Sequence, residues 1–103
     1  MTEKRKPTYD LEASKRAFAS VERLAVTGTA LRSAAALGFG RAEMVATIQT
    51  MQRGHFYKFM TAKAAPRLWQ DVYHVPSQTG VLYVKFTADV VAEFFVAFLQ
   101  GER

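Results

Sequence analysis

The stretch that decides the fold is FYKFMTAKAAPRLWQDVYHVPSQTGVLYVKFT, residues 56–87. Aromatic and β-branched residues fill three short runs in it, and turn-forming residues separate these runs. We expect strands over Phe56–Thr61, 68–75 and 81–87, the second after Pro66 and the third after the turn at 77–80. Because the connections are short, the strands are predicted to form an antiparallel meander.

Successive side chains of a strand point to opposite faces, so spacing predicts which residues share a face. The clearest alternation is in 81–87, where apolar residues occupy every second position. If the apolar sides of all three strands face one core, polar groups gather on the opposite face. The side chains predicted to share that face are Lys58, Gln70, Tyr83 and Lys85.

The same alternation predicts the sheet face on which each aromatic residue lies. It places Tyr57 with Phe59 on one side of the first strand, and Phe56 with Lys58 on the other. Large aromatic side chains bury much apolar surface. The aromatic residues that we expect in the core are Phe59, Trp69 and Tyr73.

The residues before this stretch predict helices. Asp10 is a suitable N-cap for a first helix, and 29–37 is rich in helix formers and stops at Gly38. A third helix over 41–52 carries an apolar stripe at helical spacing, while the short apolar run 23–26 predicts a small edge strand. The stripe consists of Met44, Val45, Ile48 and Met51.

The run 90–99 fits two structures. Its apolar residues are compatible with a helical stripe, but its β-branched and aromatic content favours a final buried strand. Helices first and strands later predict an α+β fold in one domain, residues 1–103, with the N-terminal helices packed on one face of an antiparallel, mostly meander sheet. The polar lead 1–8 is expected to be loosely ordered.

Composition narrows the class of protein. The chain has no cysteine, which excludes disulfides and thiolate metal sites, and half its residues are hydrophobic, as in a packed globule. The N-terminus lacks a signal peptide, and the run 90–99 is too short to span a membrane. We therefore expect a cytoplasmic protein. Its net charge of +5 favours a nucleic-acid partner.

Three motifs carry a family resemblance. FYKFM at 56–60, WQDVY at 69–73 and TGVLYVKFT at 79–87, in this order and at these spacings, resemble the motility quorum-sensing regulator (MqsR) family. These proteins are toxins of bacterial type II toxin–antitoxin systems. The lead residues 3–5 with Pro7 and the helical stretch before Phe56 are also similar, so the resemblance covers nearly the whole chain.

The resemblance implies a RelE-like fold and a metal-independent mRNA interferase that cuts single-stranded message at GCU-type sites. It implies no cofactor, a cognate protein antitoxin that suppresses the toxin, and DNA contact only indirectly through that antitoxin. The family's functional lysine, glutamine and tyrosine fall on Lys58, Gln70 and Tyr83. These are three of the four residues that alternation placed on one face.

The chain departs from the family pattern at two places. The family has a lysine near the end of the last strand, where this chain has Leu99 or a neighbour. The contribution of that lysine to phosphate binding must then come from Arg103 or Lys85. Where an arginine is expected after WQDVY, this chain has His74.

Cleaving RNA without a metal uses the 2′-hydroxyl as nucleophile. One group must take its proton, cations must stabilise the charged phosphorane, and another group must protonate the leaving oxygen. Tyr83 can orient or donate a proton, and Gln70, which does not titrate, can position a reacting group. The residues predicted to bind substrate are Lys85, Arg53, Arg67 and His74.

Each of these candidate residues also has an explanation that involves no function. An exposed face with Tyr83 and Lys85 is also typical of a solvated strand, and His74 at a strand end is either exposed or an aid to catalysis. His55, His74 and Asp71 show no metal-ligand spacing, so we predict no metal site. The alternative functions are a basic RNA- or DNA-binding regulatory module that does no chemistry, and a small interaction domain that binds only a protein partner. Neither the oligomeric state nor the mode of antitoxin docking is predicted.

Overall fold

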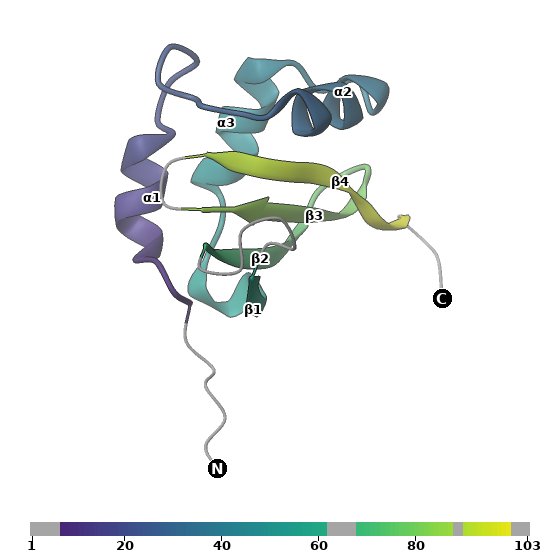
Figure 1. Ribbon diagram of the computed structural model, residues 1–103. Helices are drawn as coiled ribbons and strands as arrows, with labels where there is room; N and C mark the ends of the chain where they lie inside the picture. The colour runs from purple at the N-terminus through teal and green to yellow at the C-terminus, as the bar shows by residue number, and fades with distance from the viewer. Residues whose placement is uncertain (1–6, 62–67, 88–89, 100–103) are drawn as a thin grey trace.

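The computed structural model describes residues 7–61, 68–87 and 90–99. Three helices precede a four-stranded antiparallel sheet whose strand order is β1-β2-β3-β4 (Figure 1). The elements are α1 (Leu11–Ala17), α2 (Gly28–Ala36), α3 (Arg41–Gln49), the 3₁₀ helix η1 (Arg53–His55), β1 (Phe56–Thr61), β2 (Trp69–Pro76), β3 (Gly80–Phe86) and β4 (Val91–Leu99). The predicted α+β class and the meander are confirmed.

The strand predictions agree with the structure to within one residue at each end. The run 90–99 is a strand, as its β-branched content favoured. Ser77 stabilises the β2–β3 turn because its hydroxyl accepts the backbone N–H of Thr79 and of Gly80, each at 3.2 Å. Gly80 has a φ of 150°, which a residue with a side chain rarely adopts.

Side-chain caps define the first two helices. The Asp10 carboxylate accepts the N–H of Ala13, and the Thr27 hydroxyl accepts that of Ala30. α2 ends as predicted before Gly38, whose φ is +86°. α3 is shorter than expected and ends at Gln49, because the chain turns at Thr50; Met51 is nevertheless buried.

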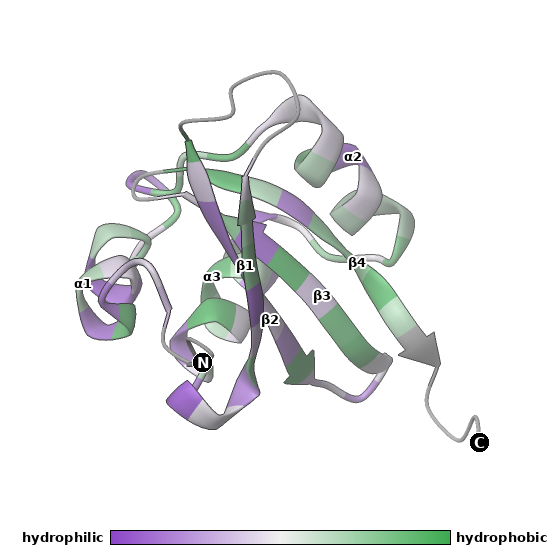
Figure 2. Ribbon diagram, turned by 60° about the horizontal axis from the view of Figure 1, so that its bottom comes forward, coloured by the Kyte–Doolittle hydropathy of each residue, from purple (hydrophilic) through white to green (hydrophobic). Residues whose placement is uncertain are grey.

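The core lies between the helices and one face of the sheet. Figure 2 shows the sheet with α3 behind it, and apolar and polar residues alternate along β3. The apolar residues Leu82, Val84 and Phe86 are buried against the helices, together with Met44 and Ile48 from α3. Burial of such side chains contributes roughly 1.5–3 kcal/mol each. We call this sheet face the helix-covered face and the opposite one the outer face.

Hydrogen bonds hold the segment before α2 to β4. The N–H of Val91 bonds the carbonyl of Ala25, the N–H of Thr27 bonds the carbonyl of Val91, and the Thr27 hydroxyl donates to the carbonyl of Ala92. The edge strand predicted over 23–26 was wrong in extent, because Val26 forms only an isolated parallel bridge with Val91.

The three aromatic residues expected in the core differ in their burial. Tyr73 is fully buried, as predicted, whereas Trp69 is 44% exposed and Phe59 is half-buried. The Trp69 prediction was wrong because this residue begins β2 opposite Thr61, the last residue of β1. It packs edge-on against Phe59, with ring centroids 5.4 Å apart.

Asp71 anchors the chain that leads into α1. Its side chain is fully buried, and its two oxygens accept the N–H of Thr8 at 2.8 Å and of Tyr9 at 2.9 Å. Of the lead 1–8, for which we expected a loose structure, residues 1–6 lie outside the described residues. Thr8 is held to the sheet by this carboxylate.

We predict that Asp71→Ala lowers the free energy of unfolding by roughly 2 kcal/mol, because it removes two charge-assisted hydrogen bonds and leaves their donors unpaired. Urea denaturation followed by circular dichroism measures the change. Glu12→Ala, which removes an exposed carboxylate from α1, is the control and should alter stability by less than about 0.5 kcal/mol. Equal stability of Asp71→Ala and the wild type would contradict the anchoring role.

Candidate active site

The strand register assembles the predicted residues on the outer face in rows that run across the strands. Lys58 of β1 lies opposite Val72 of β2, which lies opposite Lys85 of β3, which lies opposite Glu93 of β4. Because directly opposed residues share a face, these four form one row. Both lysines were predicted on one face from the alternation of side chains, and the register confirms this.

The row of lysines carries an ion pair. The Lys85 Nζ lies 3.2 Å from the Glu93 carboxylate, and the Lys85 side chain is only 12% exposed. Lys58 is exposed, and its Nζ lies 5.4 Å from the centroid of the Tyr57 ring. Within the described part of the chain no carboxylate pairs with Lys58. Its charge is therefore the one in this row that is available to an anion.

An aromatic row lies beside the lysines. His74 is opposite Tyr83, which is opposite Phe95. The ring of Tyr57 stacks on His74 with centroids 4.1 Å apart, and Tyr83 stacks on Phe95 at 4.5 Å. The centroids of His74 and Tyr83 are 6.0 Å apart, and their planes are tilted by 46°. Rings from all four strands thus form a continuous row.

Tyr57 reaches this row because β1 contains an irregularity. The register shifts between Phe56 and Lys58, so that Tyr57 is an extra residue without a partner in β2. Phe56 then lies opposite Tyr73 and packs on the core, while Tyr57 is 54% exposed. Simple alternation had assigned Phe56 and Tyr57 the other way round. That assignment was wrong because a bulge reverses the order of faces.

Gln70 lies on the other side of the lysines. It is opposite Met60, shares the face of Val72 two residues later, and is only 7% exposed. Residues two apart in a strand are separated by about 7 Å. Gln70, the row of lysines, and the row of His74 and Tyr83 therefore occupy three successive levels of the outer face, with the cations in the middle.

Burial and neighbouring charges shift the acid–base properties of two residues. Burial, followed by the positive charge of Lys58, lowers the pKa of His74 below its usual 6.5. Burial raises the pKa of Tyr83 above 10.0, and the nearby Glu93 and Tyr57 raise it further. At neutral pH the imidazole is therefore an uncharged proton acceptor, and the phenol is a protonated donor.

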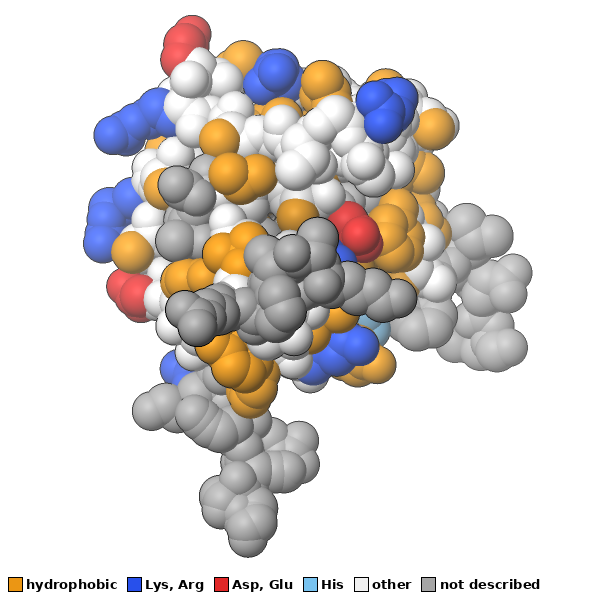
Figure 3. All heavy atoms as spheres, in the orientation of Figure 1, with side chains coloured by type: hydrophobic (Ala, Val, Ile, Leu, Met, Phe, Trp, Pro, Cys, Tyr) orange, Lys and Arg blue, Asp and Glu red, His pale blue; other side chains and the backbone are white. Residues whose placement is uncertain are grey.

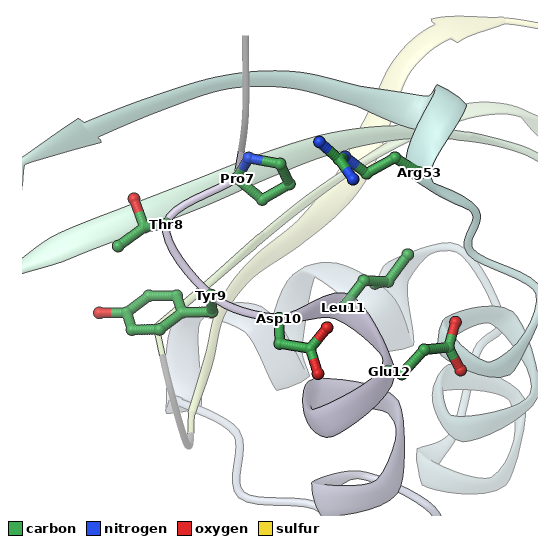
Figure 4. A pocket seen from close by; sticks show the side chains of 7 residues that line it. All are labelled: Pro7, Thr8, Tyr9, Asp10, Leu11, Glu12 and Arg53. Carbon is green, nitrogen blue, oxygen red and sulfur yellow. The ribbon is translucent and has the colours of Figure 1, made fainter. Parts of the chain in front are cut away.

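Of the two predicted arginines, Arg53 is not part of these rows. Arg67 lies outside the described residues. Arg53 belongs to η1 and lines a pocket of about 360 Å³ with residues 7–12 (Figure 4). Figure 4 shows Asp10 and Glu12 on the walls of this pocket, which is therefore of mixed charge. Seen from the side of Figure 1, basic side chains are scattered over the surface among hydrophobic ones (Figure 3).

Three residues of the outer face were not predicted. Glu93 and Phe95 lie in the run 90–99, from which no residue of this face was predicted, and the pairing of Glu93 with Lys85 depends on a β3–β4 register that shifts between Lys85 and Phe86. Tyr57 was misplaced by the bulge. The only sequence signal for Phe95 was its alternation with the buried Phe94 once a strand is assumed.

Two features are absent from the described residues. No group of three histidine, aspartate or glutamate side chains within ranges 7–61, 68–87 and 90–99 is arranged to hold a metal ion. None of the helices described there has the length and apolar character needed to cross a membrane.

Comparison with known proteins agrees with the motifs. The family described as "Motility quorum-sensing regulator, toxin of MqsA" matches residues 6–100. A curated relative, the mRNA interferase toxin MqsR of Escherichia coli (strain K12), is 34% identical over 85 residues, which cover 82% of this chain and 86% of the relative. Residues 6–100, which the family matches, include all four strands of the sheet.

We predict that His74 titrates below pH 6.5 and that Lys58→Met moves its pKa back toward 6.5, because the substitution removes a neighbouring positive charge. NMR titration of the histidine ring protons measures this pKa. Lys15→Met removes a lysine from α1 and serves as the control; it should leave the His74 titration unchanged. A His74 pKa above 6.5, or one that does not respond to Lys58→Met, would contradict the described electrostatics.

Proposed function

Because this chain belongs to the family of motility quorum-sensing regulator toxins, we propose that it is an mRNA interferase, the endoribonuclease toxin of a type II toxin–antitoxin system. It cleaves single-stranded mRNA at GCU-type sites by attack of the 2′-hydroxyl on the adjacent phosphate, without a metal ion or other cofactor. A cognate antitoxin inhibits it.

The arrangement of Lys58, Gln70 and Tyr83 is the observation that supports this proposal best. They come from three neighbouring strands and occupy three successive levels of one sheet face. A phosphate bound at the middle level meets the Lys58 ammonium, with the phenol on one side and the amide on the other. Ammonium groups stabilise the charge that develops on phosphate oxygens in the transition state.

Each of the three side chains then has a defined task. Lys58 binds the phosphate and stabilises the dianionic phosphorane. Tyr83, which remains protonated because its pKa is raised, donates a proton to the leaving 5′-oxygen. Gln70 does not titrate, so it positions the ribose or a phosphate oxygen through its amide.

The aromatic row supports a single-stranded substrate. Unstacked bases bind to aromatic side chains, whereas the bases of a duplex are already stacked on each other. Tyr57 and Phe95 end the row, and both are exposed. Lys85 contributes to substrate binding within its ion pair with Glu93, which reduces its net charge toward RNA.

The proposal includes a biological setting. In it, the toxin acts in the cytoplasm, where mRNA is translated, and it contacts DNA only through its antitoxin. Expression of the toxin alone should arrest growth, and co-expression of the cognate antitoxin should restore it. Arg53, which lies in a pocket of mixed charge, binds substrate at most at the margin of the site.

We predict that the purified protein cleaves a GCU-containing RNA in the presence of EDTA and leaves a 2′,3′-cyclic phosphate. Lys58→Ala and Tyr83→Phe should each lower kcat/KM by about 100-fold or more, because they remove charge stabilisation and proton donation. Gel analysis of end-labelled RNA measures both the rate and the product.

Matched variants separate chemistry from net charge and stability. Lys15→Ala removes the same charge from α1, and Tyr73→Phe removes a buried hydroxyl from the helix-covered face. Both should retain activity. Retention of RNA without cleavage would overturn the proposal in favour of a non-catalytic binding module, and so would equal losses in the control variants.

A further inference from the structure

The reaction needs a proton acceptor that Lys58, Gln70 and Tyr83 do not provide. We propose that His74 is the general base that takes the proton from the attacking 2′-hydroxyl, with Tyr83 as the acid on the other side of the phosphate. This inference rests on the proposed function and assigns a further catalytic residue within it.

The position of His74 suits this role. It lies directly opposite Tyr83 in the β2–β3 register, and the two ring centroids are 6.0 Å apart. In an in-line displacement the base and the acid must each come within about 3 Å of one of two different oxygens on the same phosphorus. His74 and Tyr83 lie on adjacent strands, in the row next to that of Lys58, and this arrangement meets the requirement.

The packing of the imidazole orients it on the outer face. The ring of Tyr57 stacks on His74 with centroids 4.1 Å apart and nearly parallel planes, and the Tyr83 ring is tilted against it at 6.0 Å. Stacking acts on the faces of the imidazole, whereas the nitrogens that carry its acid–base chemistry lie in the ring edge. His74 is half-buried, which holds it in place and keeps it in reach of a substrate.

The charged groups around His74 favour the neutral ring. Lys58 and Tyr57 face it from β1, Tyr83 and Lys85 from β3, and Glu93 lies across the sheet on β4. Burial and Lys58 lower the pKa of His74, so that most molecules carry a base at neutral pH. Burial, followed by Glu93 and Tyr57, raises the pKa of Tyr83. A pair whose pKa values are pushed apart in this way suits opposite proton-transfer roles.

Glu93 is the competing base on this face. Its carboxylate is 3.2 Å from the Lys85 ammonium, and the two lie in the row of lysines rather than beside Tyr83. Proton uptake by Glu93 would break this ion pair in the transition state. His74, by contrast, lies directly opposite Tyr83 in the β2–β3 register.

The proposed step balances. The imidazole takes the 2′-hydroxyl proton, the 2′-oxygen forms a bond to phosphorus, and the bond from phosphorus to the 5′-oxygen breaks as Tyr83 protonates that oxygen. The products are a 2′,3′-cyclic phosphate and a 5′-hydroxyl. The imidazolium and the tyrosinate then return to their starting states by proton exchange with water.

The first test uses the unmodified protein. The pH dependence of kcat/KM reports the ionisation of essential groups in the free enzyme. We expect activity to fall on the acid side with a pKa equal to that of His74, measured by NMR on the same protein. An acid limb that coincides instead with the titration of Glu93 or His55, or no acid limb below neutral pH, would overturn the assignment.

The second test uses matched histidine variants. His74→Gln should lower kcat/KM about 100-fold or more and abolish the acid limb, while the unfolding midpoint stays that of a folded protein. His55→Gln removes the other histidine, whose Nδ1 accepts the N–H of Gln52 at the start of η1, and should keep the wild-type profile. The assignment would be overturned if His74→Gln kept its acid limb and an activity within about threefold of the wild type. It would also be overturned if Glu93→Gln alone lost that limb.

Chemical rescue separates a catalytic from a structural role. Added imidazole should restore cleavage by His74→Ala in proportion to its concentration of neutral base, and should not stimulate Tyr83→Phe. Absence of rescue in a folded His74→Ala protein would count against proton transfer by this residue. Complete lack of cleavage by the wild type would instead overturn the proposed function itself. A wild type that cleaves while His74→Ala loses nothing would overturn only the role of His74.

Discussion

The candidate site depends on one packing constraint, the burial of the apolar side of β2 and β3 against the helices. Leu82, Val84 and Phe86 are held in the core, so the intervening residues of β3 must face the other way. A shift of the strand by one residue would place Tyr83 and Lys85 in the core, at a large cost in desolvation. Hydrophobic burial on one face therefore positions polar side chains on the other.

The outer face combines this positioning with unequal charge. Of its two lysines, Lys85 is held by Glu93, while Lys58 is exposed and close to Tyr57 and His74. Lys58 also adds to the effect of burial in lowering the pKa of His74. In the proposed mechanism this lysine binds the phosphate and lies in the row next to the phenol of Tyr83, which donates a proton.

Alternation and turn chemistry predicted the four strands, the helix-covered core and the shared face of Lys58, Gln70, Tyr83 and Lys85. They failed where the regular pattern is interrupted. Tyr57 was misplaced because one extra residue in β1 reverses the faces, and a bulge has no reliable sequence signal here. The Lys85–Glu93 pair depends on the β3–β4 register, which local spacing does not specify. Trp69 is exposed because it begins β2 opposite the last residue of β1, and hydrophobicity alone does not reveal such a position.

The central claim is that the scissile phosphate binds on the outer face of the sheet at the level of Lys58. The most direct measurement is an NMR titration of the isotope-labelled protein with a GCU-containing RNA whose attacking 2′-hydroxyl is methylated, so that it binds without being cut. The account predicts that the largest shifts occur at Lys58, Gln70, His74 and Tyr83. Shifts confined to the helices, or to the pocket formed by Arg53 and residues 7–12, would contradict it.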